Sequence, residues 1–147
     1  MSIFELTIMT ICHIMQCVLS LFVSVIFMIK RVVVAGCRNY NNYREAKEYI
    51  DFCLSKIRKR NELIFLSGHC RGADLLGERY AEENGFKIER YIAEWDKYGR
   101  GAGPKRNKIM ADKADYVICF WDGQSKGTKA MIDYVAKIGK PLRIKRI

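Results

Sequence analysis

Three polar segments of the sequence combine glycine, hydroxyl and basic residues in a way that suits the binding of an anion. They are Gly36-Cys37-Arg38-Asn39, Ser67 to Asp74, and Asp122 to Thr128. Each follows a short apolar run and precedes residues with helical spacing. Glycine lets backbone N–H groups approach an oxyanion without an intervening side chain, and a helix that starts behind the turn adds unpaired donors and partial positive charge. These segments therefore predict a phosphate-binding site.

The second and third segments share one plan, because each holds two glycines four positions apart between an expected strand and an expected helix. Neither fits the GxGxxG pattern of dinucleotide-binding turns or the GxxxxGK(S/T) pattern of P-loop nucleotide hydrolases, so ATP hydrolysis is disfavoured. Hydroxyl and basic side chains stand beside the glycines. In the three segments together, the predicted ligand contacts are Gly36, Arg38, Ser67, Gly68, Arg71, Gly72, Asp74, Gly123, Ser125, Gly127 and Thr128.

Residues 94–103 are expected to form a polar, glycine-rich loop that adds a further wall to this site. Trp95 and Tyr98 in this loop suit stacking on a base or ribose, and they equally suit plain packing without a ligand. Arg106 and Asn107 follow in the first turn of the next helix, where a cation is unfavourable unless an anion lies nearby. Trp95, Arg106 and Asn107 are therefore added to the predicted ligand contacts, with a merely exposed Arg106 as the alternative.

Asp74 is the carboxylate nearest the second segment, and two roles are open for it. Near a helix N-terminus it can cap the helix or compensate for the helix dipole. It can also hold a ribose hydroxyl or act as a general acid or base.

The six cysteines of the chain do not indicate a metal site. They include no CxxC pair, and His13 and His69 have no cysteine partners at ligand spacing. Buried thiols in a reducing cytosol are the simplest interpretation, with Cys37 or Cys70 at a strand end as a candidate reactive thiol. We therefore expect no metal, and no cofactor is indicated.

The elements that position these segments alternate along the chain from Arg31 onward. Alternating strands and helices on short connections indicate βαβ units, hence a single Rossmann-like three-layer α/β/α domain with a mainly parallel sheet of about five strands. In such sheets ligands bind beyond the carboxyl ends of the strands, where strand order reverses, so the three segments share one rim. The last strand alternates basic residues and is expected at an edge. Strands are predicted at 31–36, 63–66, 87–93, 116–121 and 142–147, and helices at 43–60, 73–84, 104–113 and 127–138.

Residues 1–29 precede this domain, which is expected to span residues 30–147. From Leu6 to Ile29 the chain holds 24 nearly all apolar residues, enough to cross a bilayer, and the basic pair that follows would leave the domain on the cytoplasmic side. A second interpretation makes this segment a translated leader upstream of a true start at Met28. A third makes it a buried helix of the domain. In each case we expect a cytoplasmic domain.

The charge of the domain favours anionic partners. All 26 basic residues but only 15 of the 16 acidic residues lie from Met28 onward, an excess of 11 positive charges. Nucleotides, nucleic acid and an anionic membrane face all fit such a field, which carries no specificity of its own. At 147 residues the chain is long enough for one packed domain, and self-association is left open.

In these turns the sequence resembles the SLOG superfamily, the Rossmann-like group that links DprA/Smf with the "lonely guy" phosphoribohydrolases, and within it the YspA/cpYpsA-related branch. The resemblance spans about residues 29–147 and implies binding of a nucleotide or nucleotide-derived ligand at the rim. Cys37 replaces a usual serine, and His69 stands where a second glycine is common. The matching residues are Val34 to Arg38, Ser67-Gly68, Arg71 to Asp74, Ala93 to Trp95, Ala102 to Pro104, Arg106, Asn107, Met110 and Gly127-Thr128.

The enzymatic part of the resemblance is incomplete. Lonely-guy enzymes carry Pro-Gly-Gly-x-Gly-Thr-x-x-Glu at the third turn, with that glutamate on the ribose. Here Met131 stands three positions after Thr128, and Asp133 lies two residues further on. The motif therefore does not predict phosphoribohydrolase activity, and whether the protein is an enzyme stays open.

Three functions follow from these residues. The first is binding, for sensing or processing, of a nucleotide-type phosphorylated small molecule at the rim of the sheet. The alternative is an N-glycosidic or phosphoribosyl hydrolase of nucleoside monophosphates that uses Asp74 or Glu94 in place of the missing glutamate. A second alternative, suggested by the basic domain, is single-stranded nucleic-acid binding, which would weaken steeply with salt.

Overall fold

Five parallel strands form the centre of the molecule, in the order β3-β2-β1-β4-β5. The computed structural model describes residues 3–26 and 28–147. The elements are α1 (Ile3–Ile26), β1 (Met28–Gly36), α2 (Tyr43–Leu54), β2 (Asn61–Ser67), α3 (Ala73–Glu83), β3 (Lys87–Arg90), α4 (Trp95–Tyr98), the 3-10 turn η1 (Gly99–Gly101), α5 (Ala102–Lys113), β4 (Tyr116–Trp121), α6 (Lys126–Lys137) and β5 (Leu142–Arg146). The Rossmann-like α/β fold predicted from the sequence is confirmed.

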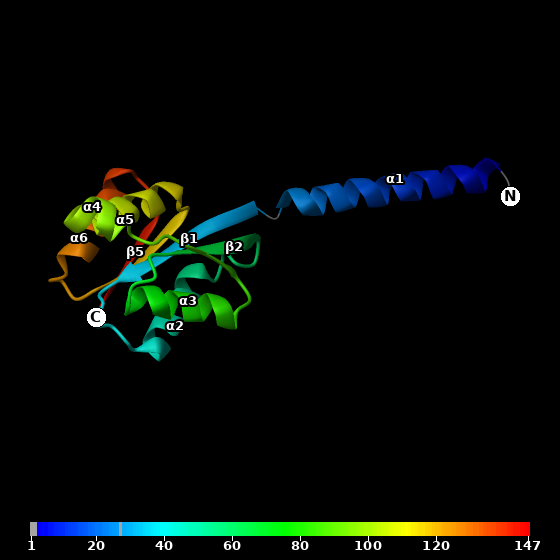
Figure 1. Cartoon of the computed structure of the whole chain (residues 1–147). Coiled ribbons are helices and arrows are strands. Elements are labelled where there is room, and N and C mark those ends of the chain that lie inside the picture. Colours follow the sequence, from blue (N-terminus) through cyan, green and yellow to red (C-terminus); the bar gives the residue numbers. More distant parts are fainter. Residues whose placement is uncertain (1–2, 27) are drawn as a thin grey trace.

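Helices cover both faces of the sheet, α2 and α3 on one and α4, α5 and α6 on the other (Figure 1). Successive residues of a strand point to opposite faces, so Val32 and Val34 pack with α2 and α3, whereas Val33 packs with α5 and α6. Because both faces are covered, the inner strands are apolar at nearly every position. Ile50 and Tyr80 anchor the first layer.

The strand order reverses between β1 and β4. From β1 the chain moves outward through β2 to β3, and it then returns to the other side of β1 with β4 and β5. The turns after β1 and β4 therefore diverge at the carboxyl ends of adjacent strands and leave a crevice between them. A side chain at Gly36 would overlap the Phe120 carbonyl oxygen, so glycine keeps the two strands close up to this point.

Several predicted boundaries are wrong by one or more residues. The helix predicted over residues 43–60 ends at Leu54, and residues 55–60 form turns in which the Ile57 N–H donates to the Leu54 carbonyl at 3.0 Å. β1 starts three residues earlier than predicted, since Met28 to Lys30 pair with β2. β3 ends at Arg90 and not at Ala93.

The segment predicted as an irregular loop is helical. Residues 95–98 form α4, residues 99–101 form η1, and α5 begins at Ala102, two residues before the predicted start at Pro104. Proline is tolerated in the first turn of a helix because its missing N–H would have no partner there. Gly99, with a φ of 49°, supplies the left-handed residue that ends α4.

α1 precedes β1 and extends away from the sheet (Figure 1). The side chains of residues 3–18 are exposed, which excludes the interpretation of this segment as a buried helix of the domain. Within residues 3–26 and 28–147, no helix meets the length and apolarity that a membrane crossing requires. Residue 27 of the predicted span 6–29 lies outside the described residues.

Candidate ligand-binding site

A cavity of about 630 Å³ opens where the strand order reverses. Its walls come from the turn after β1, the turn after β4, the facing sides of α5 and α6, and α4 with η1. Of the fourteen ligand contacts predicted from the sequence, nine line this cavity. They are Gly36, Arg38, Asp74, Trp95, Arg106, Asn107, Ser125, Gly127 and Thr128.

The turn after β4 is held by its own side chains. The Asp122 carboxylate accepts hydrogen bonds from the backbone N–H groups of Ser125 and Gln124, both at 2.8 Å, and these bonds lower the pKa of Asp122. Ser125 caps α6, with its Oγ 3.0 Å from the Thr128 hydroxyl. The first-turn amides beyond Ser125 have no partner within the helix. The Thr128 N–H donates to the Ser125 hydroxyl at 3.5 Å, and Gly127 in the same turn lines the cavity.

The turn after β1 is joined to this turn through Cys37. The backbone N–H of Asp122 donates to the Cys37 sulfur at 3.4 Å, and the Thr128 hydroxyl lies 3.9 Å from the same atom. The thiol is buried, so Cys37 links two walls of the cavity. Arg38, the next residue, is exposed and lines the cavity, and its guanidinium donates no hydrogen bond to the residues that the structure describes.

Most of the turn after β2 lies outside the cavity, contrary to the prediction that it contacts the ligand. Ser67, Gly68, Arg71 and Gly72 do not line the cavity, and this turn reaches it through Cys70 and Asp74. Ser67 instead accepts a hydrogen bond from the His69 backbone at 3.0 Å. Gly72, with a φ of 85°, packs so closely on the turn after β1 that a side chain would overlap it. The glycines of this turn therefore serve packing inside the protein.

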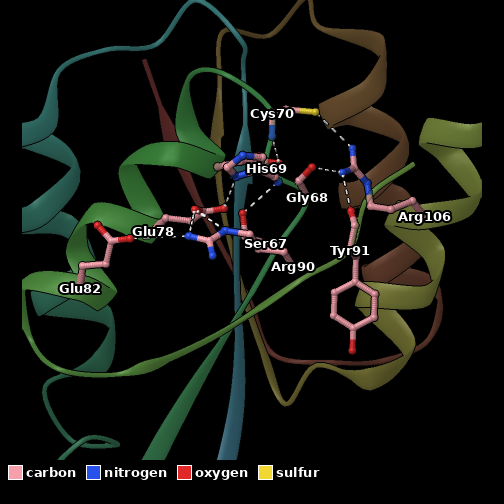
Figure 2. A network of polar contacts seen from close by, with 10 residues as sticks. Ser67, Gly68, His69, Cys70, Glu78, Glu82, Arg90, Tyr91 and Arg106 are labelled. Carbon is pink, nitrogen blue, oxygen red and sulfur yellow. Dashed lines mark hydrogen bonds and ion pairs between the residues drawn. The ribbon is translucent and has the colours of Figure 1, made fainter. Parts of the chain in front are cut away.

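An ionic network around the buried Glu78 contacts the turn after β2 (Figure 2). Glu78 accepts two hydrogen bonds from Arg90, at 2.7 and 2.9 Å, and lies 2.9 Å from Nδ1 of His69. Burial raises the pKa of Glu78, but hydrogen bonds from Arg90, Ser67 and His69 outweigh it and leave the pKa below its usual value. His69 adopts a φ of 53°, an uncommon conformation for a residue with a side chain, which these contacts support.

Arg106 is predicted to face a bound anion, but its donors are occupied by the protein. The side chain is 8% exposed. Nη1 donates to the carbonyl oxygens of Gly68 and Tyr91, Nη2 donates to the Cys70 sulfur at 3.3 Å, and Nε donates to Asn107 at 2.9 Å (Figure 2). Arg106 therefore ties α5 to the turn after β2 and shapes the cavity wall.

Asp74 is the buried carboxylate of the cavity, 6% exposed. Burial raises its pKa to about 6, against the opposing effects of Arg106 and the Cys70 N–H. The Cys70 N–H donates to Oδ2 at 3.4 Å, while Oδ1 accepts no hydrogen bond from the described residues and is not sealed from the cavity. Gly72 holds the N-cap position of α3, so Asp74 compensates for the helix dipole and does not cap the helix.

The cavity residues that the sequence prediction missed include Arg100 on η1, Lys108 on α5, and Met131 and Tyr134 on α6. Helical spacing carries a signal for the last two, because residues three, four and seven positions apart lie on one face and Gly127 begins that row. Tyr98, by contrast, does not line the cavity, and its ring lies 3.6 Å from Lys105. Glu94 does not line it either.

Cysteine, histidine and carboxylate side chains do not gather into a metal site in the part of the chain that the structure describes. Cys37 and Cys70 both line the cavity, and both are free thiols. The chemistry that the cavity offers is therefore that of amides, cations, an aromatic surface and one buried carboxyl.

Comparison with known proteins agrees with this architecture. The chain is similar to the structure of DNA processing protein A (DprA) from Streptococcus pneumoniae, with a TM-score of 0.60 and 20% identity over 80% of this chain and 50% of that chain. It is also similar to the structural-genomics protein TM1055, with a TM-score of 0.55 and 19% identity over 77% and 72% of the two chains. The chain thus spans about half the length of DprA, and the likeness concerns the fold. No curated protein matches it significantly in sequence.

Residues 30–98 match the family described as YspA, cpYpsA-related SLOG family. This stretch runs from β1 to the end of α4 and includes Arg38, Asp74 and Trp95 of the cavity wall. The resemblance drawn from the turns is confirmed. Residues 30–98 belong to the YspA, cpYpsA-related SLOG family.

Proposed function

We propose that this protein binds a nucleotide or nucleotide-derived phosphorylated small molecule in the cavity between β1 and β4. The observation that carries the proposal is the position of that cavity. It lies at the reversal of strand order, where open parallel sheets bind their ligands, and the first turn of α6 borders it at Gly127.

The charges of the cavity wall support an anionic ligand. Arg38, Arg100 and Lys108 line the cavity and are exposed, so their cationic groups can meet a phosphate. Asp122 also lines the cavity, but its Oδ1 accepts hydrogen bonds from the Gln124 and Ser125 backbones, whereas Asp74 is the buried carboxylate of the wall. The open Oδ1 of Asp74 suits a hydroxyl donor such as that of a ribose.

Calorimetric titration tests the proposal directly. The panel comprises nucleoside mono- and diphosphates, ADP-ribose and cyclic nucleotides. We expect at least one of these to bind and to raise the melting temperature, because a ligand that binds the folded state stabilises it. Arg38→Ala should lower the affinity about tenfold, as expected for the loss of a charge-assisted hydrogen bond.

Arg71→Ala is the matched control. Arg71 is also an exposed arginine in a turn at this rim, but it does not line the cavity, so its replacement should leave the affinity unchanged. Failure of every ligand to bind contradicts the proposal, as does equal weakening by the two arginine variants.

Asp74 supports a second candidate function, hydrolysis of the N-glycosidic bond of a nucleoside monophosphate. With a pKa of about 6, its carboxylate is a competent base near neutral pH. In this reaction a water oxygen forms a bond to the anomeric carbon while the bond to the base nitrogen breaks. Asp74 takes one water proton and passes a proton to the departing base.

Release of free base from nucleoside monophosphates measures this activity. We expect Asp74→Asn to abolish release, and Glu94→Gln to leave it unchanged, because Glu94 lies outside the cavity. No base release at high protein concentration rejects the hydrolase and leaves the binding function intact.

A further inference from the structure

Trp95 is an aromatic side chain of the cavity wall. It is 48% exposed. Within the described residues its ring has no aromatic or cationic neighbour, and its indole N–H donates no hydrogen bond. Six other partly exposed aromatic rings of the domain, in contrast, each have a lysine or arginine over them, namely Tyr43, Tyr49, Tyr91, Tyr98, Trp121 and Tyr134. Trp95 therefore lines the cavity with an indole that no cation or aromatic ring of the described residues covers.

The edge of the Trp95 ring is held against α5. A side-chain carbon at Gly103 would lie 3.2 Å from Cη2 of Trp95 and 3.9 Å from the two neighbouring ring carbons. Glycine at this buried position lets the outer edge of the ring reach the helix backbone. The contact holds one edge of the ring against α5, and 48% of the residue stays exposed.

Positive charge lines the same cavity as this aromatic surface. Arg100, five residues along the chain, and Lys108 on α5 are both among its wall residues. A flat ring and cations in one cavity fit a ligand that joins a heteroaromatic base to an anionic group, because every base has a face that stacks on an indole.

We propose that Trp95 is the stacking platform for the base of the ligand, so that the site selects nucleobase-bearing phosphates over the sugar phosphate alone. This inference rests on the proposed nucleotide-binding function, and it names the base as the part of the ligand that the indole recognises. Trp95 is then a specificity-determining residue.

The experiment compares adenosine 5′-monophosphate with ribose 5-phosphate, which lacks the base, by calorimetric titration of the full chain. We expect the nucleotide to bind roughly 10- to 100-fold more tightly, the usual effect of stacking one base on an aromatic side chain. Trp95→Ala should remove this preference and leave the affinity for ribose 5-phosphate unchanged. Trp95→Phe should restore part of the preference.

Tyr98→Ala is the control within α4, because Tyr98 is an aromatic residue of the same short helix outside the cavity. It should bind both compounds as the wild type does. In a Trp121→Phe background, where Trp95 is the remaining tryptophan, the nucleotide should quench the fluorescence and ribose 5-phosphate should not.

The outcomes separate the two proposals. Suppose that the nucleotide binds, but the Trp95→Ala protein still prefers it to ribose 5-phosphate, or binds both compounds more weakly by the same factor. The proposal that Trp95 stacks on the base is then wrong, and the proposed binding site is unaffected. If the wild type binds neither compound nor any nucleotide of the wider panel, the proposed function fails and the platform fails with it.

Discussion

At the scale of single residues, the glycines of the rim divide into two groups. A side chain at Gly68 would overlap the Arg106 guanidinium and approach Asp74, and one at Gly72 would overlap the backbone of the turn after β1. A side chain at Gly127 would meet no protein atom within 4 Å. Packing therefore explains the first two glycines. At Gly127 no contact with the described residues requires glycine, and we propose that the bound ligand uses this space.

Gly127→Ala should separate stability from binding. Alanine favours a helix over glycine by up to about 1 kcal/mol, so the free energy of unfolding should stay equal or rise. Nucleotide affinity should fall about tenfold or more, because the new methyl group occupies the anion's approach to the first turn of α6. Urea unfolding and calorimetric titration measure the two effects. Gly68→Ala, in contrast, should lower the free energy of unfolding. A stable Gly127→Ala protein that binds the nucleotide with full affinity would show that the anion does not bind at the first turn of α6.

Asp74 should make stability depend on pH. Its folded-state pKa of about 6 lies above the ordinary value of 3.8, so the folded protein binds a proton more tightly than the unfolded chain does. Stability should therefore fall as the pH rises from about 4 to 6 and then level off, at a cost on the order of 2 to 3 kcal/mol. Asp74→Asn should remove this slope and be more stable than the wild type at pH 7. Urea unfolding at several pH values tests both, and a less stable Asp74→Asn protein at pH 7 would contradict the argument.

At the scale of elements, the sequence was informative where a local pattern decides the structure. Apolar runs and helical spacing predicted five strands and their order of alternation with helices, and the glycine-rich turns predicted the rim. The edge position of β5 was also predicted. There the Tyr49 hydroxyl donates to the Ile144 carbonyl at 3.1 Å, which covers part of the open edge.

The turn after β2 shows what local pattern leaves undecided. Its serine, glycines and arginine look like those of a phosphate-binding turn, but Glu78 and Arg90 lie 11 and 23 residues beyond Ser67, and Arg106 lies on another helix. These charged residues reach the turn only in the folded chain, where they form hydrogen bonds with its polar groups. Another tertiary contact lies in the expected loop at 94–103, which forms α4 and η1, where the edge of Trp95 packs on Gly103.

Arg106→Lys should loosen the junction between α5 and the turn after β2. A lysine ammonium cannot bridge acceptors on four residues as the planar guanidinium does. Buried carbonyl oxygens left without donors cost about 1 to 3 kcal/mol each, so we expect the free energy of unfolding to fall by about 2 to 4 kcal/mol. Arg100→Lys, an exposed cation of the same cavity, should change stability by less than about 0.5 kcal/mol. Equal stability of the two variants in urea unfolding would show that Arg106 does not act as a clamp.

At the scale of the whole molecule, the cavity and α1 lie at opposite ends of the strands of the sheet. The cavity lies at the carboxyl ends of β1 and β4, while α1 joins β1 at its amino end, Met28, on the opposite side of the sheet (Figure 1). The positive excess of the chain lies entirely in the part that follows α1. Anion binding is therefore a property expected of residues 28–147 alone.

Deletion of residues 1–27 tests this separation. β1 begins at Met28 and pairs there with Asn61, so the shortened chain keeps every strand pair of the sheet. Because the side chains of residues 3–18 are exposed, their removal takes away no buried core, and the free energy of unfolding should change by less than about 0.5 kcal/mol. Nucleotide affinity should be unchanged. Urea unfolding and calorimetric titration of the two chains measure this, with Arg38→Ala in the shortened chain losing affinity as it does in the full chain. A shortened protein that is less stable, or that binds more weakly, would show that α1 contacts the domain and contributes to the site.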